Sequence, residues 1–256
     1  MTITAIGSGK GGTGKTLIAT SLAHALAHQG ERVLLCDADF GLSNAGVHLG
    51  LSQTGDLAGV LAGTKTLKDA VVRVTSGRAG FDILAAPSGS GALANASGDA
   101  VEMLIGTLER AHNYDRVIVD LGAGVEANVM ALAAHADEVL LVLSPDPSSL
   151  TDAYAFAKLL LRRTTSRVPH IVVNMAANPT EGRRIADALM ASARAFLKAT
   201  PEFLGFIPYD TRVSDAVRRQ GQLLTLFPQT PAAVAIEGIA RKMHGVSPPI
   251  AAAGLR

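Results

Sequence analysis

Short apolar runs alternate with longer helical segments along nearly the whole chain. The apolar runs, interpreted as buried strands, cover residues 3–6, 33–36, 81–84, 117–120, 138–144, 170–174 and 203–210. Helices are predicted at residues 17–29, 101–111, 211–220 and 231–244. Strands and helices that alternate at this spacing predict a parallel sheet with right-handed crossovers. We therefore expect an α/β fold in three layers, with a mostly parallel, twisted sheet of about seven to eight strands flanked by helices.

The composition indicates a globular domain with a short tail. Apolar residues make up 48% of the 256 residues, enough for a sizeable core. We expect one domain over residues 1–245 and a flexible tail over 246–256. A single cysteine, Cys36, excludes a disulfide framework within the chain. The first predicted strand leaves no room for a signal peptide, and no apolar run approaches roughly 18 residues, so we expect a cytoplasmic protein.

The net charge of +1 is unevenly divided along the chain. Residues 1–150 hold 9 Lys and Arg against 15 Asp and Glu, whereas residues 151–256 hold 14 against 7. A basic half can attract DNA, anionic lipid or an acidic partner. The alternative is a set of solvated helix faces, because the arginine doublets are scattered in the sequence.

A glycine-rich motif follows the first predicted strand and precedes a predicted helix. It has the phosphate-loop spacing of Gly, four residues, Gly, Lys and Thr, in that order. Glycines let the backbone approach phosphate oxygens, and the helix start adds unpaired N–H groups and a positive dipole end. We expect Lys15 along the β- and γ-phosphates and the Thr16 hydroxyl on Mg²⁺, within a P-loop NTPase fold. The candidate nucleotide-binding residues here are Gly9, Lys10, Gly11, Gly12, Thr13, Gly14, Lys15, Thr16 and Leu17.

Aspartates stand at the ends of two predicted strands. Ligands of parallel sheets collect at the carboxyl ends of strands, so Asp37, Asp39 and Asp120 are candidates for the metal side of the site. We expect Asp39 to orient the attacking water and to sense the γ-phosphate. Asp37 is expected to support Mg²⁺ waters or the phosphate-loop lysine, and Asp120 to hold Mg²⁺ mainly through a water. Residues 40–44 and 121–124 would be two switch segments.

The early lysine in the loop gives the motif a family resemblance. Lys10, in the run Lys-Gly-Gly-Thr-Gly-Lys-Thr, resembles the deviant phosphate loop of the MinD/ParA family. In that family two copies sandwich two ATP molecules, and the early lysine reaches the phosphates of the partner. The resemblance therefore implies an ATP-dependent homodimer in which Lys10, Lys15 and Asp39 carry catalysis, with ATP and Mg²⁺ as cofactors.

Further segments resemble the FlhG (also FleN) branch of flagellar-number regulators. Residues 37–51 begin Asp-Ala-Asp-Phe-Gly-Leu-Ser-Asn and are similar to a run of that branch. Residues 55–67 resemble its short helical insertion. Residues 145–154 resemble the loop and helix by the family's dimer contact, where Thr151 and Asp152 suit a first helical turn. The family usually has Thr after the aspartate matched by Asp120, but here Leu121 removes that hydroxyl.

The resemblance also implies where the adenine ring is recognised. The family has an Asn at the end of a strand that contacts the ring, which makes Asn174 the candidate. The counterpart of residues 203–210 also contacts the base, so Asp210 is expected to accept from the exocyclic amine and Pro208 to lie against the ring. Ordinary turn roles for Asn174 and Asp210 stay open.

The function implied is a slow ATP hydrolase that gates a homodimer and positions cell-surface machinery, above all flagella, through protein partners. A ParA-type DNA-partition ATPase is the alternative and would use the basic half to hold DNA. An iron–sulfur carrier ATPase is disfavoured by the lone Cys36, and a non-hydrolysing nucleotide-binding scaffold stays open. Pro248 and Pro249 interrupt the tail, so binding to the inner face of the plasma membrane is less supported than the family would imply.

Overall fold

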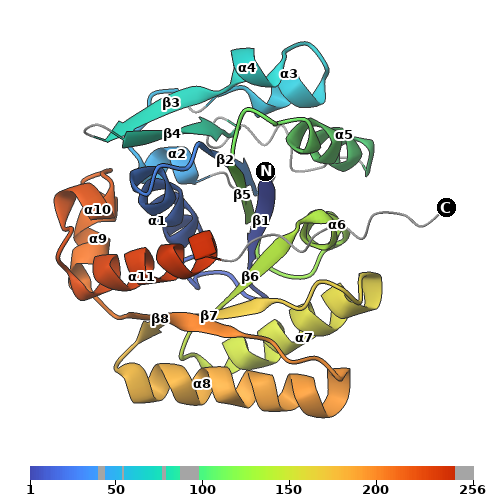
Figure 1. Cartoon of the computed structure of the whole chain (residues 1–256), viewed down its shortest axis with the longest axis vertical. Helices are drawn as coiled ribbons and strands as arrows, with labels where there is room; N and C mark the ends of the chain where they lie inside the picture. Colours follow the sequence, from blue (N-terminus) through green and yellow to red (C-terminus); the bar gives the residue numbers. More distant parts are fainter. Residues whose placement is uncertain (40–43, 54, 77–78, 87–97, 246–256) are drawn as a thin grey trace.

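One sheet organises the molecule (Figure 1). The computed structural model describes residues 1–39, 44–53, 55–76, 79–86 and 98–245. Within them, eight strands pair in the order β3-β4-β2-β5-β1-β6-β7-β8, and all pairs are parallel except β3 with β4. The predicted α/β class and mostly parallel sheet are confirmed. The strands are β1 (Thr2–Gly7), β2 (Val33–Ala38), β3 (Val72–Ser76), β4 (Ala79–Leu84), β5 (Arg116–Leu121), β6 (Glu138–Leu143), β7 (His170–Ala176) and β8 (Phe203–Pro208).

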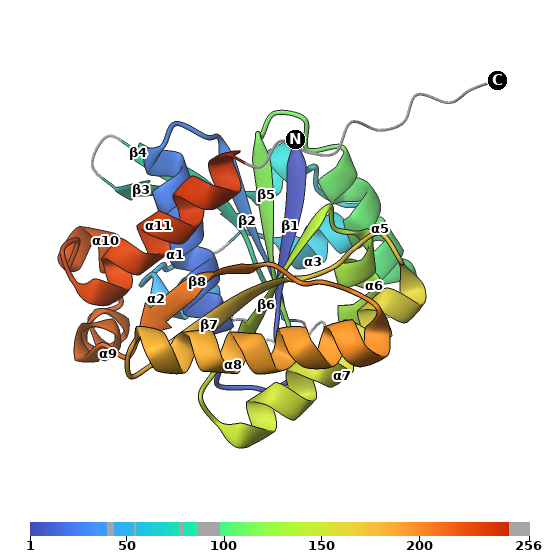
Figure 2. The ribbon, with the colours of Figure 1, turned by 60° about the horizontal axis from the view of Figure 1, so that its bottom comes forward.

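Helices cover both faces of the sheet and complete the three layers (Figures 1 and 2). One face is covered by α1 (Lys15–His28), α2 (Ala45–His48), α9 (Thr211–Arg218), α10 (Leu223–Leu226) and α11 (Pro231–Gly245). The other is covered by α3 (Leu57–Leu61), α4 (Leu67–Ala70), α5 (Gly98–Glu109), α6 (Ala127–His135), α7 (Pro147–Arg163) and α8 (Pro179–Ser192), with η1 (Ala193–Leu197) as a π-helical turn. None of the described helices has the length and apolar character needed to cross a membrane.

The strand order explains where a ligand can bind. From β1 the chain passes through α1 to β2, and β5 lies between these two strands. The later strands β6, β7 and β8 are added on the opposite side of β1. The order in which strands are added therefore reverses at β1. At such a point a crevice opens at the carboxyl ends of the strands.

The structure extends the sequence predictions at the sheet edge. The helical insertion expected at residues 55–67 is present as α3 and the start of α4. Strand β3, which pairs antiparallel with β4, was not predicted. Most of the first switch (40–43), most of the loop after β4 (87–97) and the tail (246–256) lie outside the described residues.

Candidate active site

The phosphate loop joins the end of β1 to the start of α1. Gly12 and Gly14 have φ values of +77° and +87°, a region that favours glycine. Packing also requires glycine: a Cβ on Gly14 would lie 2.3 Å from the Asn174 Nδ2, and one on Gly9 would lie 2.1 Å from the Asp152 carbonyl oxygen. The loop is therefore held in its bent form by its own backbone and by contacts from β7 and α7.

Two aspartates meet on neighbouring strands beside this loop. Asp37 of β2 and Asp120 of β5 are register partners, and both are buried. The Asp37 carboxylate accepts backbone N–H bonds from Asp39 (3.1 Å), Asn44 (3.0 Å) and Ala45 (3.0 Å). Asp37 therefore anchors the start of α2, directly after the predicted first switch.

Asp120 is fully buried beside Thr16 and Lys15. Neither of its oxygens has a hydrogen-bond partner in the part of the chain that the structure describes. Burial, followed by the neighbouring Asp37, raises the pKa of Asp120 to about 8, while the nearby Thr16 hydroxyl and Lys15 ammonium oppose that rise. A buried carboxylate with open oxygens is costly unless a cation or proton satisfies it.

The donors around Asp120 fit a hard, oxygen-binding cation. Thr16 begins the first turn of α1 with Lys15, whose side chain is buried. Asp39 directly follows β2, and a Cβ on Gly122 would lie 3.7 Å from its Oδ1. No group of three His, Cys, Asp or Glu among the described residues forms a closed metal site. Mg²⁺ commonly takes one or two carboxylates and completes its shell with water and phosphate, which suits this open arrangement.

The segment after Asp120 is tied to the phosphate loop. The Gly124 N–H donates to the Ser8 carbonyl oxygen at 3.0 Å, and Gly124 has a φ of +94°. The Ser8 hydroxyl in turn donates to the Lys10 carbonyl oxygen at 2.6 Å. Leu121, which replaces the family's usual Thr, is packed in the hydrophobic core. The hydrogen bond that links this segment to the phosphate loop is therefore a backbone bond, from Gly124.

Lys10 is paired within its own chain. Its Nζ lies 2.7 Å from the Asp146 carboxylate and 2.6 Å from the Ser148 hydroxyl. Asp146 caps α7 by accepting from the Ser148 N–H, and the bond from Lys10 holds the pKa of Asp146 well below its usual range. The sequence pointed to Thr151 and Asp152 as the first turn, but α7 begins earlier, because Asp146 and Pro147 form the cap and the first helical position.

The residues proposed to read the base lie at the carboxyl ends of β7 and β8. Asn174 is buried and donates from Nδ2 to the Thr13 carbonyl oxygen at 2.8 Å, so it supports the phosphate loop. Asp210 caps α9 through the Arg212 N–H and also accepts from the Ala232 N–H. Pro208 ends β8. All three lie at the same end of the strands as the phosphate loop, but contact with a base remains a prediction.

Sequence reasoning missed the residues that hold the loop lysine and the loop carbonyls. Ser8, Asp146 and Ser148 were not among the candidates, although each bonds to Lys10. Asp before Pro at a helix start is a recognisable cap signal that could have identified Asp146. Nothing local to Ser8 indicated its role, because its partners come from the fold of the loop.

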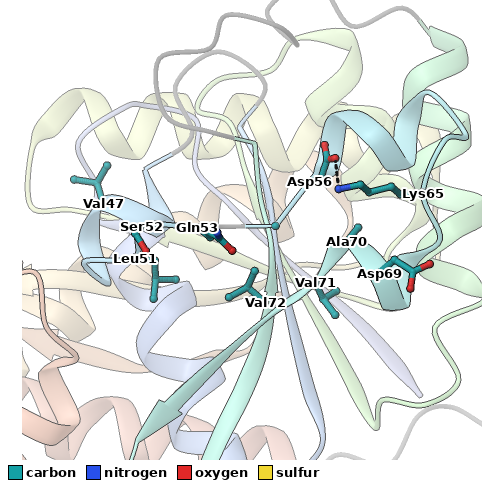
Figure 3. A pocket seen from close by; sticks show the side chains of 12 residues that line it. Val47, Leu51, Ser52, Gln53, Asp56, Lys65, Asp69, Ala70, Val71 and Val72 are labelled. Carbon is teal, nitrogen blue, oxygen red and sulfur yellow. Dashed lines mark ion pairs between the residues drawn. The ribbon is translucent and has the colours of Figure 1, made fainter.

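The described lining of a cavity of about 810 Å³ contains none of the candidate site residues (Figure 3). Asp56 and Lys65 form an ion pair of 2.8 Å along its wall. Because α2 contributes to the cavity and is anchored by Asp37, one wall is tied to the candidate site. The described lining residues are Gly46, Val47, Leu51, Ser52, Gln53, Gly55, Asp56, Lys65, Asp69, Ala70, Val71 and Val72.

Comparison with known families decides the affiliation. Residues 4–223, which include the loop, both strand-end aspartates and Asn174, match the CbiA family, the CobQ/CobB/MinD/ParA nucleotide binding domain. The chain belongs to this family. Its fold agrees with that membership: MinD in the MinC:MinD cell division complex of Aquifex aeolicus superposes with a TM-score of 0.76 at 29% identity, covering 99% of this chain and 100% of that one.

Two curated members of the CobQ/CobB/MinD/ParA family share a flagellar description. The antiactivator FleN of Pseudomonas aeruginosa is 38% identical over 242 residues, covering 94% of this chain and 85% of FleN. The flagellum site-determining protein YlxH of Helicobacter pylori is 31% identical over 238 residues, covering 92% of this chain and 79% of YlxH. The resemblance to the FleN branch is confirmed.

Proposed function

We propose that this chain is a slow, Mg²⁺-dependent ATPase that works as an ATP-gated homodimeric switch in setting the number or placement of flagella. The observation that carries the ATPase is the meeting of Lys15, Thr16 and the open carboxylate of Asp120 beside a glycine loop. Similarity to FleN over 94% of the chain supports the flagellar assignment.

Each candidate residue has a role that follows from its position in the site. Lys15 neutralises the β- and γ-phosphates, and backbone N–H groups of residues 9–17 surround them. Thr16, Asp39 and Asp120 hold Mg²⁺, which when bound offsets the charge of the phosphates. Asp39 orients the attacking water. Asn174, Pro208 and Asp210, at the carboxyl ends of β7 and β8, contact the base in this scheme.

The proposed switch depends on a change in the groups that Lys10 contacts. In the single chain Lys10 is bonded to Asp146 and Ser148. In the proposed dimer Lys10 leaves this pair and reaches the phosphates of the second copy, so each site is completed by the other subunit. Hydrolysis removes the γ-phosphate contacts, and the equilibrium returns to the monomer.

Two variants test this scheme. Lys15→Ala should lose ATP affinity, because the phosphate charge is no longer offset, and should stay monomeric. Asp39→Ala should bind ATP with Mg²⁺, fail to hydrolyse it and accumulate as a dimer. Calorimetry measures binding, size exclusion with ATP or ADP measures assembly, and phosphate release measures turnover. If Asp39→Ala binds ATP and elutes only as a monomer, the dimer scheme is wrong; ATP binding without phosphate release by the unmodified protein indicates a scaffold.

A ParA-type role in DNA partition is the second candidate. The excess of Lys and Arg in residues 151–256 favours it, together with exposed cations such as Arg163, Arg184 and Arg241 on separate helices. DNA binding by the ATP form that falls steeply with added salt would support this role. Binding that is equally strong with ATP and ADP would not, because a partition switch must release DNA after hydrolysis.

A further inference from the structure

Four cations of the acidic half converge on one cavity far from the phosphate loop. Residues 1–150 hold only 9 Lys and Arg, and four of them line a cavity of about 610 Å³. They come from separate places in the chain: Arg32 precedes β2, Lys68 lies in α4, Arg73 in β3, and Arg110 follows α5 (Figure 1). The fold therefore collects positive charge that the sequence disperses.

The charges in this cavity are only partly balanced. Arg32 forms a two-pronged pair with Asp115 (3.0 and 2.7 Å), and Arg73 pairs with Asp82 at 3.1 Å. Asp82, the one acid among the described lining residues, also accepts from the Tyr114 hydroxyl at 2.7 Å.

The remaining two cations have no such balance. Lys68 and Arg110 are exposed and have no ion-pair partner in the described part of the chain. Asp69, the residue after Lys68, bonds to Thr66 and lines the neighbouring 810 Å³ cavity instead. The unpaired Lys68 and Arg110 thus lie beside Arg32 and Arg73, each of which already forms an ion pair.

The shape and chemistry of the cavity match a phosphate-bearing anion. Its volume lies within the range of small-ligand sites. Guanidinium groups bond phosphate oxygens in pairs, and a lysine adds a compact charge. Asn113 supplies an amide to the same lining. We propose that this cavity binds a small phosphate-bearing anion, with Lys68 and Arg110 as its principal contacts.

The position of the cavity separates it from the candidate active site. Arg32 directly precedes β2, and Tyr114 comes shortly before β5, so the cavity lies at the amino ends of these strands. The phosphate loop lies at the carboxyl end of β1. Anion binding here is therefore expected without nucleotide and without an intact phosphate loop. The anion can be free in solution or the headgroup of a lipid, because both present the same oxygens.

The test uses the full chain carrying Lys15→Ala, without Mg²⁺, to suppress binding at the phosphate loop. Calorimetric titration with inorganic tripolyphosphate should give an affinity that falls as salt is added. Adding Lys68→Ala and Arg110→Ala should weaken it by about tenfold. The matched control, Lys158→Ala with Arg194→Ala, removes two exposed cations on α7 and η1 and should change the affinity by less than about twofold. Thermal unfolding checks that both double variants fold.

A second arm identifies the source of the anion. Vesicles of phosphatidylglycerol and of phosphatidylcholine are sedimented with the same proteins. Loss of phosphatidylglycerol binding in Lys68→Ala/Arg110→Ala, with retention in the control, supports the proposal with a lipid headgroup as the source. Loss of tripolyphosphate binding alone supports it with a soluble ligand. If neither probe distinguishes the Lys68→Ala/Arg110→Ala protein from the control, the proposal is wrong.

Discussion

Asp37 and Asp120 are the same residue type, buried to the same degree and adjacent in the sheet, yet they are satisfied differently. Asp37 receives backbone N–H bonds from Asp39, Asn44 and Ala45, so its charge is stabilised by the segment that it anchors. Asp120 receives none within the described residues. Asp37 therefore anchors the start of α2, whereas Asp120 is the carboxylate whose burial a proton or a bound cation would offset.

His24 makes stability depend on pH. It is buried on α1 with its Nε2 3.0 Å from the Nε2 of His28, and burial, followed by the effect of His28, lowers its pKa from 6.5 to about 4. His24 and His48 of α2 line one small cavity, and burial lowers the pKa of His48 too. At pH values between 4 and 6.5, the unfolded chain binds more protons at His24 than the folded protein does. The free energy of unfolding is therefore unaffected by His24 above pH 6.5 and falls as the pH drops towards 4.

We expect His24 to contribute a loss of about 2 kcal/mol in the free energy of unfolding between about pH 7.5 and pH 5. Urea unfolding of the His24→Gln protein at both pH values should show a correspondingly smaller loss. His112→Gln, at an exposed position, serves as the control and should keep the full pH dependence. Equal pH dependence in all three proteins would refute the role of His24.

At the residue scale the sequence predicts which side chains gather but not what each one contacts. Lys15, Thr16, Asp37 and Asp120 are recognisable because a motif or a strand end fixes their backbone position. The different surroundings of Asp37 and Asp120 depend on the backbone N–H groups of Asp39, Asn44 and Ala45, which donate to Asp37 alone in the described residues, and no local pattern encodes this. The bond from Asn174 to Thr13 is likewise a contact over 161 positions.

At the scale of elements, the start of α7 is coupled to the phosphate loop. Asp146 both caps α7 and pairs with Lys10, and the Asp152 carbonyl lies directly over Gly9. A lysine that must reach a second subunit is thus restrained by the helix next to it. Both partners are about half exposed, so the restraint is modest and can be broken by a competing phosphate.

Asp146→Asn tests this restraint, because Asn caps a helix as well as Asp but carries no charge. Lys10 should be released, and the ATP concentration needed for half-maximal dimerisation should fall by about two- to fivefold. Light scattering during ATP titration measures it. Asp187→Asn, which removes an exposed pair with Arg183 on α8, is the control and should leave the midpoint unchanged. An unchanged or higher midpoint for Asp146→Asn would show that the pair does not oppose assembly.

Strands with a continuous apolar run were predictable, but the short strand β3 was not. The helices α6 and α8 were not predicted either, although α8 is 14 residues long. The buried strands β1, β2, β5, β6 and β7 are nearly continuous apolar runs, as expected for strands covered on both faces. Strand β3 alternates apolar and polar residues over only five positions, and it is defined by antiparallel pairing with β4. That pairing is a tertiary event, so the local sequence gave weak evidence for it.

For the molecule as a whole, the candidate active site and the buried Arg116 lie at opposite ends of the strands. The candidate site lies at the carboxyl ends of the strands, where Asp120 is left open. At the amino ends a buried Arg116 donates to Glu31 (2.9 Å), Glu138 (2.9 Å), Thr4 (3.0 Å) and the Met243 carbonyl oxygen (3.2 Å). One side chain thereby joins β5, β1, β6, α11 and the segment before β2. The buried Arg116 is thus bonded at every side of its guanidinium group, whereas the buried Asp120 has no hydrogen-bond partner among the described residues.

Arg116→Met should therefore reduce stability without changing the site. Arg116, Glu31 and Glu138 are 5%, 9% and 10% exposed, so removing the arginine takes the buried cation away from two largely buried carboxylates. Among the described residues, Glu31 then keeps only His244 and Glu138 only the Thr4 hydroxyl as side-chain partners. We expect a loss of roughly 3–5 kcal/mol in the free energy of unfolding by urea, against less than about 1 kcal/mol for Arg183→Met, whose pair is exposed. At a temperature where Arg116→Met remains folded, calorimetry should give its ATP affinity within about twofold of the unmodified protein. A large loss of affinity in the folded variant would show instead that the two edges are coupled through β5, the strand that carries both Arg116 and Asp120.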